Sequence, residues 1–272
     1  MMWTRVLLLC VSLPLFAQWP NFPSKGVPMK DGKPDLTAPA PRTAWDKPDF
    51  SGLWENGRGG PAAAGAVPLD PPTITFANIG AGIKGGLPLK PWAAELLKQR
   101  TADHSKDNPD AHCLPMGIMQ YHEHPQPRKI VQTPDMLLII YEANAGLRQI
   151  FLDGRPSPPA DVDPWWFGYS VGHWEGDTLV VETTHTRDIS WLDINGSPLT
   201  PDGKIIERFR RPNFGNLEII VTVDDPTAYT APFTVAVRQR IMLNQELIEF
   251  VCAENDKFGT YLNSASKAGA PK

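Results

Sequence analysis

Short runs of alternating apolar and polar residues dominate the chain after Pro127, and the breaks between them contain residues typical of tight turns. Alternation of this kind is typical of half-buried β-strands, because successive side chains of a strand point to opposite faces. Asp153-Gly154 and Asn195-Gly196 are two of the turn signals. The pattern predicts nine strands: 129–132, 136–142, 147–152, 169–174, 178–184, 205–210, 217–223, 233–243 and 246–252.

The short connections between these runs predict antiparallel neighbours, and a sheet of this many strands commonly curls or closes. We therefore predict an all-β domain, an antiparallel up-and-down barrel or a strongly curled sheet, in preference to a two-sheet sandwich. One short helix is predicted at 91–101, because Pro91 is favourable in a first turn and Trp92 and Leu96 share a face.

The first part of the chain differs in composition and in hydrophobic periodicity. Residues 18–90 are rich in Pro, Gly and Ala and show no lasting periodicity, which predicts an extended, loop-rich arm with one strand near 50–55. The barrel domain is expected to cover 91–256, and residues 257–272 are predicted to form a flexible tail.

The N-terminus predicts export. Arg5 precedes an apolar run at 6–16, which is too short to span a bilayer, and the small Ala17 follows it, so that 1–17 is predicted to be a signal peptide that is removed. A lipoprotein signal at Cys10 is the alternative. We expect a periplasmic or secreted protein without a transmembrane segment, in which Cys113 and Cys252 can form a disulfide; two separate buried thiols are the other possibility.

Charge narrows the range of partners. The formal net charge is -4 and the pI is about 5.9, which argues against a nucleic-acid partner, because phosphate binding needs a clustered basic surface. Arg208, Arg210 and Arg211 do cluster, but Glu207 interrupts the run, and a solvated strand end is the favoured interpretation.

The clearest hairpin lies at 168–185 and turns at Glu175-Gly176-Asp177. Its core, SVGHWEGDTLVVET at 170–183, is accompanied by KPDFSGLW at 47–54, RQIFLDGR at 148–155, IERFRR at 206–211, VDDPTAYTAPF at 223–233 and EFVCAEN at 249–255. This combination resembles a family of exported bacterial proteins of unknown function over most of the mature chain. The resemblance implies export and brings no established activity. The Gly-x-Trp at 52–54 is also similar to the opening strand of lipocalin-like barrels, in which the Trp closes the barrel floor.

Strand parity gives the first set of candidate site residues. His173, Glu182 and Glu207 are candidate catalytic acids and bases, and Arg148 and Glu249 are candidate ligand-binding residues, if their strand faces line a barrel interior. Ionisable groups in a poorly hydrated interior must pair or shift their pKa values. The alternative is that they form cross-strand ion pairs on a solvated face.

A proline-rich loop gives the second set. Asp153 and Arg155 precede it and the adjacent Trp165 and Trp166 follow it, so all four are candidate ligand-binding residues at a barrel rim. The alternative is that the two tryptophans form a core plug under a long loop.

Two further patterns carry less weight. His112, His122 and His124 are close in sequence, but surface histidines are favoured over a metal site because the spacing matches no standard ligand set. Gly168-Tyr-Ser170-Val-Gly172 matches the letters of a nucleophile elbow without its strand-turn-helix context, which indicates a chance match. No metal or cofactor is predicted.

The leading hypothesis is an exported barrel that binds a small apolar or aromatic molecule, with Trp165, Trp166 and Trp174 as walls and with polar anchors at Arg148, His173 and Glu182. One alternative is a cofactor-free acid/base enzyme, a lyase, isomerase or hydrolase, that uses His173 with Glu182 or Glu207. Another is a cell-envelope interaction protein whose Pro-rich arm docks on a partner.

Overall fold

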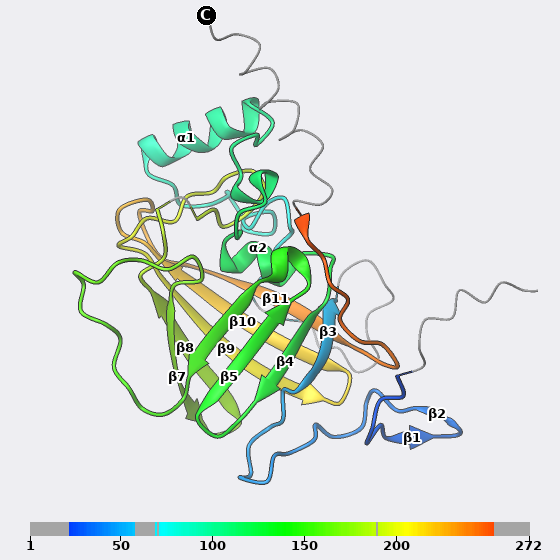
Figure 1. Cartoon of the computed structure of the whole chain (residues 1–272). Helices are drawn as coiled ribbons and strands as arrows, with labels where there is room; N and C mark the ends of the chain where they lie inside the picture. The colour runs from blue at the N-terminus through cyan, green and yellow to red at the C-terminus, as the bar shows by residue number, and fades with distance from the viewer. Residues whose placement is uncertain (1–21, 58–68, 70, 189, 253–272) are drawn as a thin grey trace, which may run out of the picture.

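Nine strands close into a barrel in the computed structural model, which describes residues 22–57, 69, 71–188 and 190–252 (Figure 1). The predicted all-β barrel is therefore confirmed. The predicted signal peptide 1–17 and tail 257–272 lie outside the described residues. The barrel strands are β3 (Gly52–Asn56), β4 (Arg128–Gln132), β5 (Met136–Tyr141), β6 (Leu147–Phe151), β7 (Tyr169–Glu175), β8 (Thr178–Thr184), β9 (Lys204–Asn213), β10 (Asn216–Asp224) and β11 (Phe233–Met242).

The strands follow the order β10-β11-β3-β4-β5-β6-β7-β8-β9 around the barrel. All neighbours are antiparallel except β6 and β7, which run parallel and pair only at Ile150 with Ser170 and at Phe151 with Val171. A parallel pair needs a long connection, and residues 152–168 provide it. The β6–β7 junction is therefore the part of the barrel wall with the fewest paired residues.

Eight of the nine predicted strands are present, and the prediction for 246–252 is wrong, because no strand forms there. Its place beside β11 is taken by β3, which pairs with β11 on one side and β4 on the other. The confirmed Cys113–Cys252 disulfide instead ties the end of this segment to the region after α1 (Pro91–Ala102), with a Cα–Cα distance of 5.4 Å. One barrel strand thus comes from the part of the chain predicted as an arm.

The remaining elements are short. The predicted helix is α1, and a second helix, α2 (Ile118–Glu123), was not predicted; all six of its residues are buried. Figure 1 shows α2 against one end of the barrel and α1 beyond it. Two single-turn helices, η1 (Pro109–His112) and η2 (Ala143–Ala145), and the small ribbon of β1 (Met29–Lys30) and β2 (Lys33–Pro34) complete the list. None of the described helices is long and apolar enough to cross a membrane.

Inward-facing side chains fill the barrel. Trp54 from β3 is fully buried, and its indole N–H donates to the Phe50 carbonyl at 2.9 Å. The Arg211 guanidinium lies 4.9 Å from the Trp54 ring, so Arg211 is part of the core, and its predicted place on a solvated strand end is wrong. A void of about 10 Å³ lies beside Trp54 and Phe209, enough for one water molecule.

Candidate functional site

Glu207 is the centre of a buried polar cluster inside the barrel. It points inward from β9, and its Oε1 accepts from Arg148 Nη1 at 3.0 Å and lies 2.6 Å from His122 Nε2. Arg148 Nη2 also donates to Glu207 Oε2, so the guanidinium binds both carboxylate oxygens. The three side chains come from β9, β6 and α2, and all are almost completely buried.

Two hydroxyls extend this cluster toward β7 and β8. Arg148 Nη2 donates to Thr183 Oγ1 at 2.9 Å and Arg148 Nε donates to Ser170 Oγ at 3.3 Å, while the two hydroxyls lie 2.8 Å apart. Among the described residues, the side-chain partners of Ser170 are thus Arg148 and Thr183, and neither can accept a proton from it as a general base would. It is followed by the β7–β8 hairpin, so the predicted chance match to a nucleophile elbow agrees with the local structure.

The electrostatics of the cluster follow from its burial. Burial by itself would raise the pKa of Glu207, but the charge of Arg148 and the hydrogen bond from His122 lower it to about 2. Burial lowers the pKa of His122, and the neighbouring Glu207 only partly offsets this effect. The expected state at neutral pH is a Glu207 carboxylate paired with Arg148 and a neutral His122 that donates to it.

This cluster is well built to hold the barrel together and poorly placed for chemistry on a substrate. Every oxygen of Glu207 is hydrogen-bonded, and the void beside His122 holds about 10 Å³. A general acid or base must come within hydrogen-bond reach of a substrate atom, and among the described residues the void beside His122 is too small for a substrate.

The other two candidate catalytic residues lie on the outer surface. His173 on β7 is opposite Val180, and Glu182 on β8 is opposite Val171, so the two occupy diagonal positions on one face. Backbone positions at diagonal sites are roughly 7–8 Å apart. The His173 side chain is 68% exposed and its Nε2 lies 3.4 Å from Glu175 Oε1. The structure therefore separates His173 and Glu182 from Glu207 by the barrel wall.

A groove of about 300 Å³ lies on the outer surface where β6 meets β7, and we call it the seam groove. It forms where the strand pairing is shortest and where the 152–168 connection returns over the barrel wall. Outward side chains of β6 and β7 line it, together with the end of that connection, Pro115 and the inward-facing Ser170. The lining residues are Pro115, Leu147, Gln149, Phe151, Trp165, Trp166, Phe167, Gly168, Tyr169 and Ser170.

Backbone contacts fix the aromatic wall of the seam groove. The Trp165 N–H donates to the His185 carbonyl at 2.9 Å, and Trp165 forms an isolated bridge with Thr186. The rings of Trp165 and Tyr169 lie 5.3 Å apart, and those of Phe151 and Tyr169 lie 5.2 Å apart. The aromatic side chains are thus positioned by strand pairing and by each other before any ligand arrives.

The predicted polar pair Asp153 and Arg155 borders the seam groove. Arg155 Nε donates to Asp153 Oδ1 at 2.9 Å, and the guanidinium lies 3.9 Å from the Phe151 ring. Hydrogen bonds from Arg155 lower the pKa of Asp153, which keeps its carboxylate charged. The two charges neutralise each other at the edge of an otherwise apolar and aromatic wall.

The remaining predicted residues lie elsewhere. Trp174 packs against Phe50, with ring centroids 5.5 Å apart, and Glu249 is exposed in the segment after β11. Arg148 is separated from the seam groove by Ser170, which lines it. The structure therefore places Trp165 and Trp166 in the seam groove and Arg155, with its partner Asp153, against the lining residues Phe151 and Tyr169. Trp174, Glu249, His173 and Glu182 do not line this groove.

Sequence reasoning missed four residues of importance. His122, predicted as a surface histidine, is buried against Glu207, so this prediction is wrong. Leu147, Phe151 and Tyr169 line the seam groove, and their alternation with the inward Arg148, Ile150 and Ser170 is the signal that could have identified them.

Within the part of the chain that the structure describes, no three His, Cys, Asp or Glu side chains gather closely enough to hold a metal ion. No family model, curated protein or solved structure matches the chain.

Proposed function

We propose that this protein binds a small, uncharged apolar or aromatic molecule in the seam groove, on the outside of the barrel. The observation that carries the proposal is the group of exposed and half-buried aromatic side chains around a concave site of about 300 Å³. Pockets of roughly this size, with apolar and aromatic walls and few polar groups, are typical of small-molecule sites.

Exposure of the wall supports a ligand rather than a purely structural role. Leu147 is 48% exposed and Trp165 is 40% exposed, although both belong to ordered, hydrogen-bonded backbone. Large apolar side chains that gather in one concave patch are typical of a binding surface, whereas isolated exposed ones are not. A planar ligand would cover both side chains and stack on the tryptophan ring.

The charges at the groove edge favour an uncharged ligand. Arg155 is already bound to Asp153 by several hydrogen bonds, so neither group is available to neutralise a ligand charge without breaking that pair. Gln149 and the Tyr169 hydroxyl are the uncharged polar groups that can orient a ligand by hydrogen bonding.

We also propose that the protein acts in an oxidising compartment outside the cytoplasm. Disulfides persist in such compartments, and the Cys113–Cys252 bond together with the predicted targeting segment supports this location. Detection of the processed chain in a periplasmic or culture fraction would test the location independently of ligand binding.

Calorimetric titration with 2-naphthol, a planar and nearly apolar probe, tests the binding proposal. We expect saturable binding to the full chain, weakened about tenfold or more by Trp165→Ala, because a well-packed aromatic contact contributes roughly 1–3 kcal/mol in area and stacking. Leu147→Ser should weaken binding by a smaller factor, since it removes less apolar area.

Two matched variants serve as controls. Val131→Ser changes a side chain that is 40% exposed on β4 and does not line the seam groove, and Trp45→Ala removes an exposed tryptophan that does not line it either. Both should bind 2-naphthol like the unchanged protein. Equal losses in Leu147→Ser and Val131→Ser, or no saturable binding at all, would refute the proposal.

A further inference from the structure

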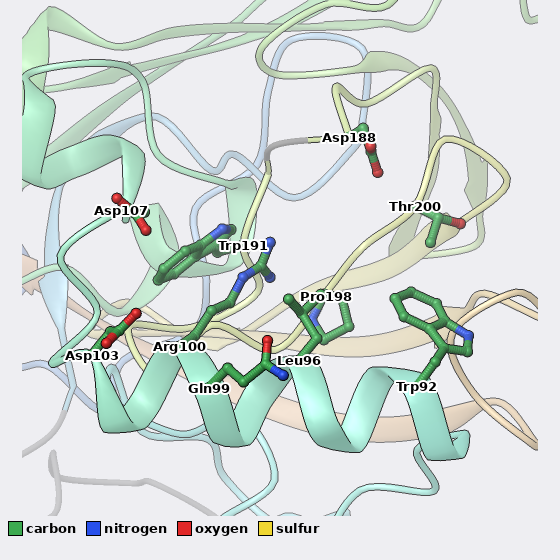
Figure 2. Close-up of a pocket in the computed structure, with 10 residues that line it drawn as sticks. All are labelled: Trp92, Leu96, Gln99, Arg100, Asp103, Asp107, Asp188, Trp191, Pro198 and Thr200. Atoms are coloured by element: carbon green, nitrogen blue, oxygen red, sulfur yellow. The ribbon is translucent and has the colours of Figure 1, made fainter.

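A second groove, of about 590 Å³, lies between α1 and the segment 188–200 that follows β8, and we call it the α1 groove. Figure 2 shows side chains of α1 on one wall and those of the 188–200 segment on the other. Its lining residues differ from those of the seam groove throughout, so the two sites are independent.

One end of the α1 groove is apolar. Trp92 and Leu96 are one helical turn apart on α1 and therefore share a face, and Pro198 lies across from them. Trp92 is 45% exposed although its indole N–H is bound to the Thr227 carbonyl at 3.1 Å. The ring is therefore held in a fixed orientation with much of its surface uncovered.

The groove also carries an excess of negative charge. Three carboxylates line it, those of Asp103, Asp107 and Asp188, against the single guanidinium of Arg100. Asp103 is paired with Lys106 at 3.3 Å. Within the described residues, Asp107 and Asp188 make no ion pair.

Arg100 is held by contacts within the protein, and its single positive charge offsets only part of this excess. Its guanidinium lies 4.4 Å from the Trp191 ring, and Nη1 donates to the Gly196 carbonyl at 2.8 Å. Burial lowers the pKa of Arg100, and the charges of Asp188 and Asp107 act against this lowering.

We propose that the α1 groove binds an organic cation with an apolar body, such as an ammonium group attached to an aromatic ring. The apolar body would cover Trp92, Leu96 and Pro198, and the cation would lie near the carboxylate of Asp188, while Asp107 at the other end of the groove adds to the negative charge (Figure 2). The same charges oppose an anionic ligand of equal size.

Three probes of similar size and different charge test this proposal: phenethylammonium, 2-phenylethanol and phenylacetate. We expect calorimetric titration of the full chain to give the tightest binding for the ammonium, about fivefold tighter than for the alcohol, with the carboxylate weakest. Salt should weaken binding of the ammonium, because exposed charges are screened over about 8–10 Å at physiological ionic strength.

Charge-neutral variants locate the cation. Asp107→Asn with Asp188→Asn should reduce the affinity for phenethylammonium about fivefold and leave that for 2-phenylethanol unchanged. Glu95→Gln is the matched control, because Glu95 is an exposed carboxylate on α1 that does not line the groove. The Trp92 indole N–H resonance, followed by NMR, should shift on titration with the ammonium in the unchanged protein and report contact directly.

Three results would overturn the proposal: equal affinity for the three probes, unchanged ammonium binding in the double aspartate variant, or an unmoved Trp92 resonance at saturation. Trp165→Ala should bind phenethylammonium like the unchanged protein. The outcome for the seam groove is thereby kept separate, because its variants lie on β6 and the 152–168 connection and do not line the α1 groove.

Discussion

Glu207 shows how a single buried charge can determine stability in this barrel. Its carboxylate is bound by Arg148 on one side and by His122 on the other. Removing one partner of a buried pair leaves an uncompensated charge, which is far more destabilising than loss of an exposed pair.

Arg148→Met should lower the free energy of unfolding by about 3–5 kcal/mol, because it leaves Glu207 buried without its cation. The comparison is Arg208→Met on the same barrel, where an exposed Arg208–Glu175 pair at 2.6 Å is broken. Arg208→Met should lower the free energy of unfolding by about 1 kcal/mol or less. Denaturant unfolding of both measures the difference, and equal costs would show that the buried cluster is not the stabilising feature described here.

The cluster also predicts acid sensitivity. Because burial lowers the pKa of folded His122 below its ordinary value of 6.5, the unfolded chain binds a proton first as the pH falls. Stability should therefore decline below pH 6.5, by at most about 1.4 kcal/mol per pH unit from this group. Protonation of Glu207 adds a second loss of stability as the pH falls from 4.5, the ordinary pKa of a glutamate, to about 2, the pKa of Glu207 in the folded protein.

His122→Gln should reduce the loss of stability between pH 7.5 and 5.5 by about 1 kcal/mol, since the amide still donates to Glu207 and does not titrate. Denaturant unfolding at the two pH values provides the measurement. His173→Asn, which changes an exposed imidazole, is the control and should keep the full loss. An undiminished loss in His122→Gln would contradict the account.

At the residue scale, sequence periodicity predicted which side chains share a strand face and could not predict which face is inside. Arg148 and Glu207 were predicted to lie with apolar neighbours, and both point into the barrel. Glu182 has the same kind of pattern but lies outside. It pairs with Ile206, the residue before Glu207, so the side chains of Glu182 and Glu207 lie on opposite sides of the barrel wall. His122 carried no signal, because every residue of α2 is buried and no amphipathic pattern results.

At the element scale, β3 decides whether the barrel closes. It is the only strand from the first part of the chain to join the described barrel, and it bridges β11 and β4. Gly52 begins it with φ +144, and a Cβ at this position would lie 2.7 Å from Ile241 Cδ1 on β11. The glycine adopts this backbone conformation and leaves room for the end of the Ile241 side chain.

Gly52→Ala should therefore destabilise the protein by about 3 kcal/mol, from an unfavourable backbone conformation together with overpacking against β11. Gly154→Ala is the control, because Gly154 also has a positive φ, +79, but has open space around it. Gly154→Ala should lower the free energy of unfolding by about 1 kcal/mol. Thermal or denaturant unfolding compares the two, and similar losses would show that the close approach of Gly52 and Ile241 is unimportant.

Strand existence was predictable from alternation and turn residues, whereas strand pairing was not. The segment 246–252 alternates like its neighbours, yet β3 takes the position beside β11 and the disulfide holds Cys252 at Cys113 instead. Both are contacts between residues far apart in sequence, which local patterns do not encode. The parallel β6–β7 pair, and with it the seam groove, depends on the path of the 152–168 connection and was likewise not predictable.

At the scale of the whole molecule, the barrel is a filled scaffold with candidate sites on its outside. Trp54, Phe209 and the Glu207 cluster occupy the interior, where the void beside them measures about 10 Å³. The seam groove, at about 300 Å³, and the α1 groove, at about 590 Å³, lie outside the barrel wall. The sequence-based hypothesis of a ligand inside the barrel is thereby replaced by a proposal of binding on its surface.

A crystal structure of the full chain soaked with 2-naphthol tests this central claim most directly. We predict electron density for the naphthol in the seam groove, packed on Trp165 and Trp166, with the side chains around Trp54 and Glu207 unmoved. Density for the probe inside the barrel, or an empty seam groove at a saturating concentration, would contradict the account.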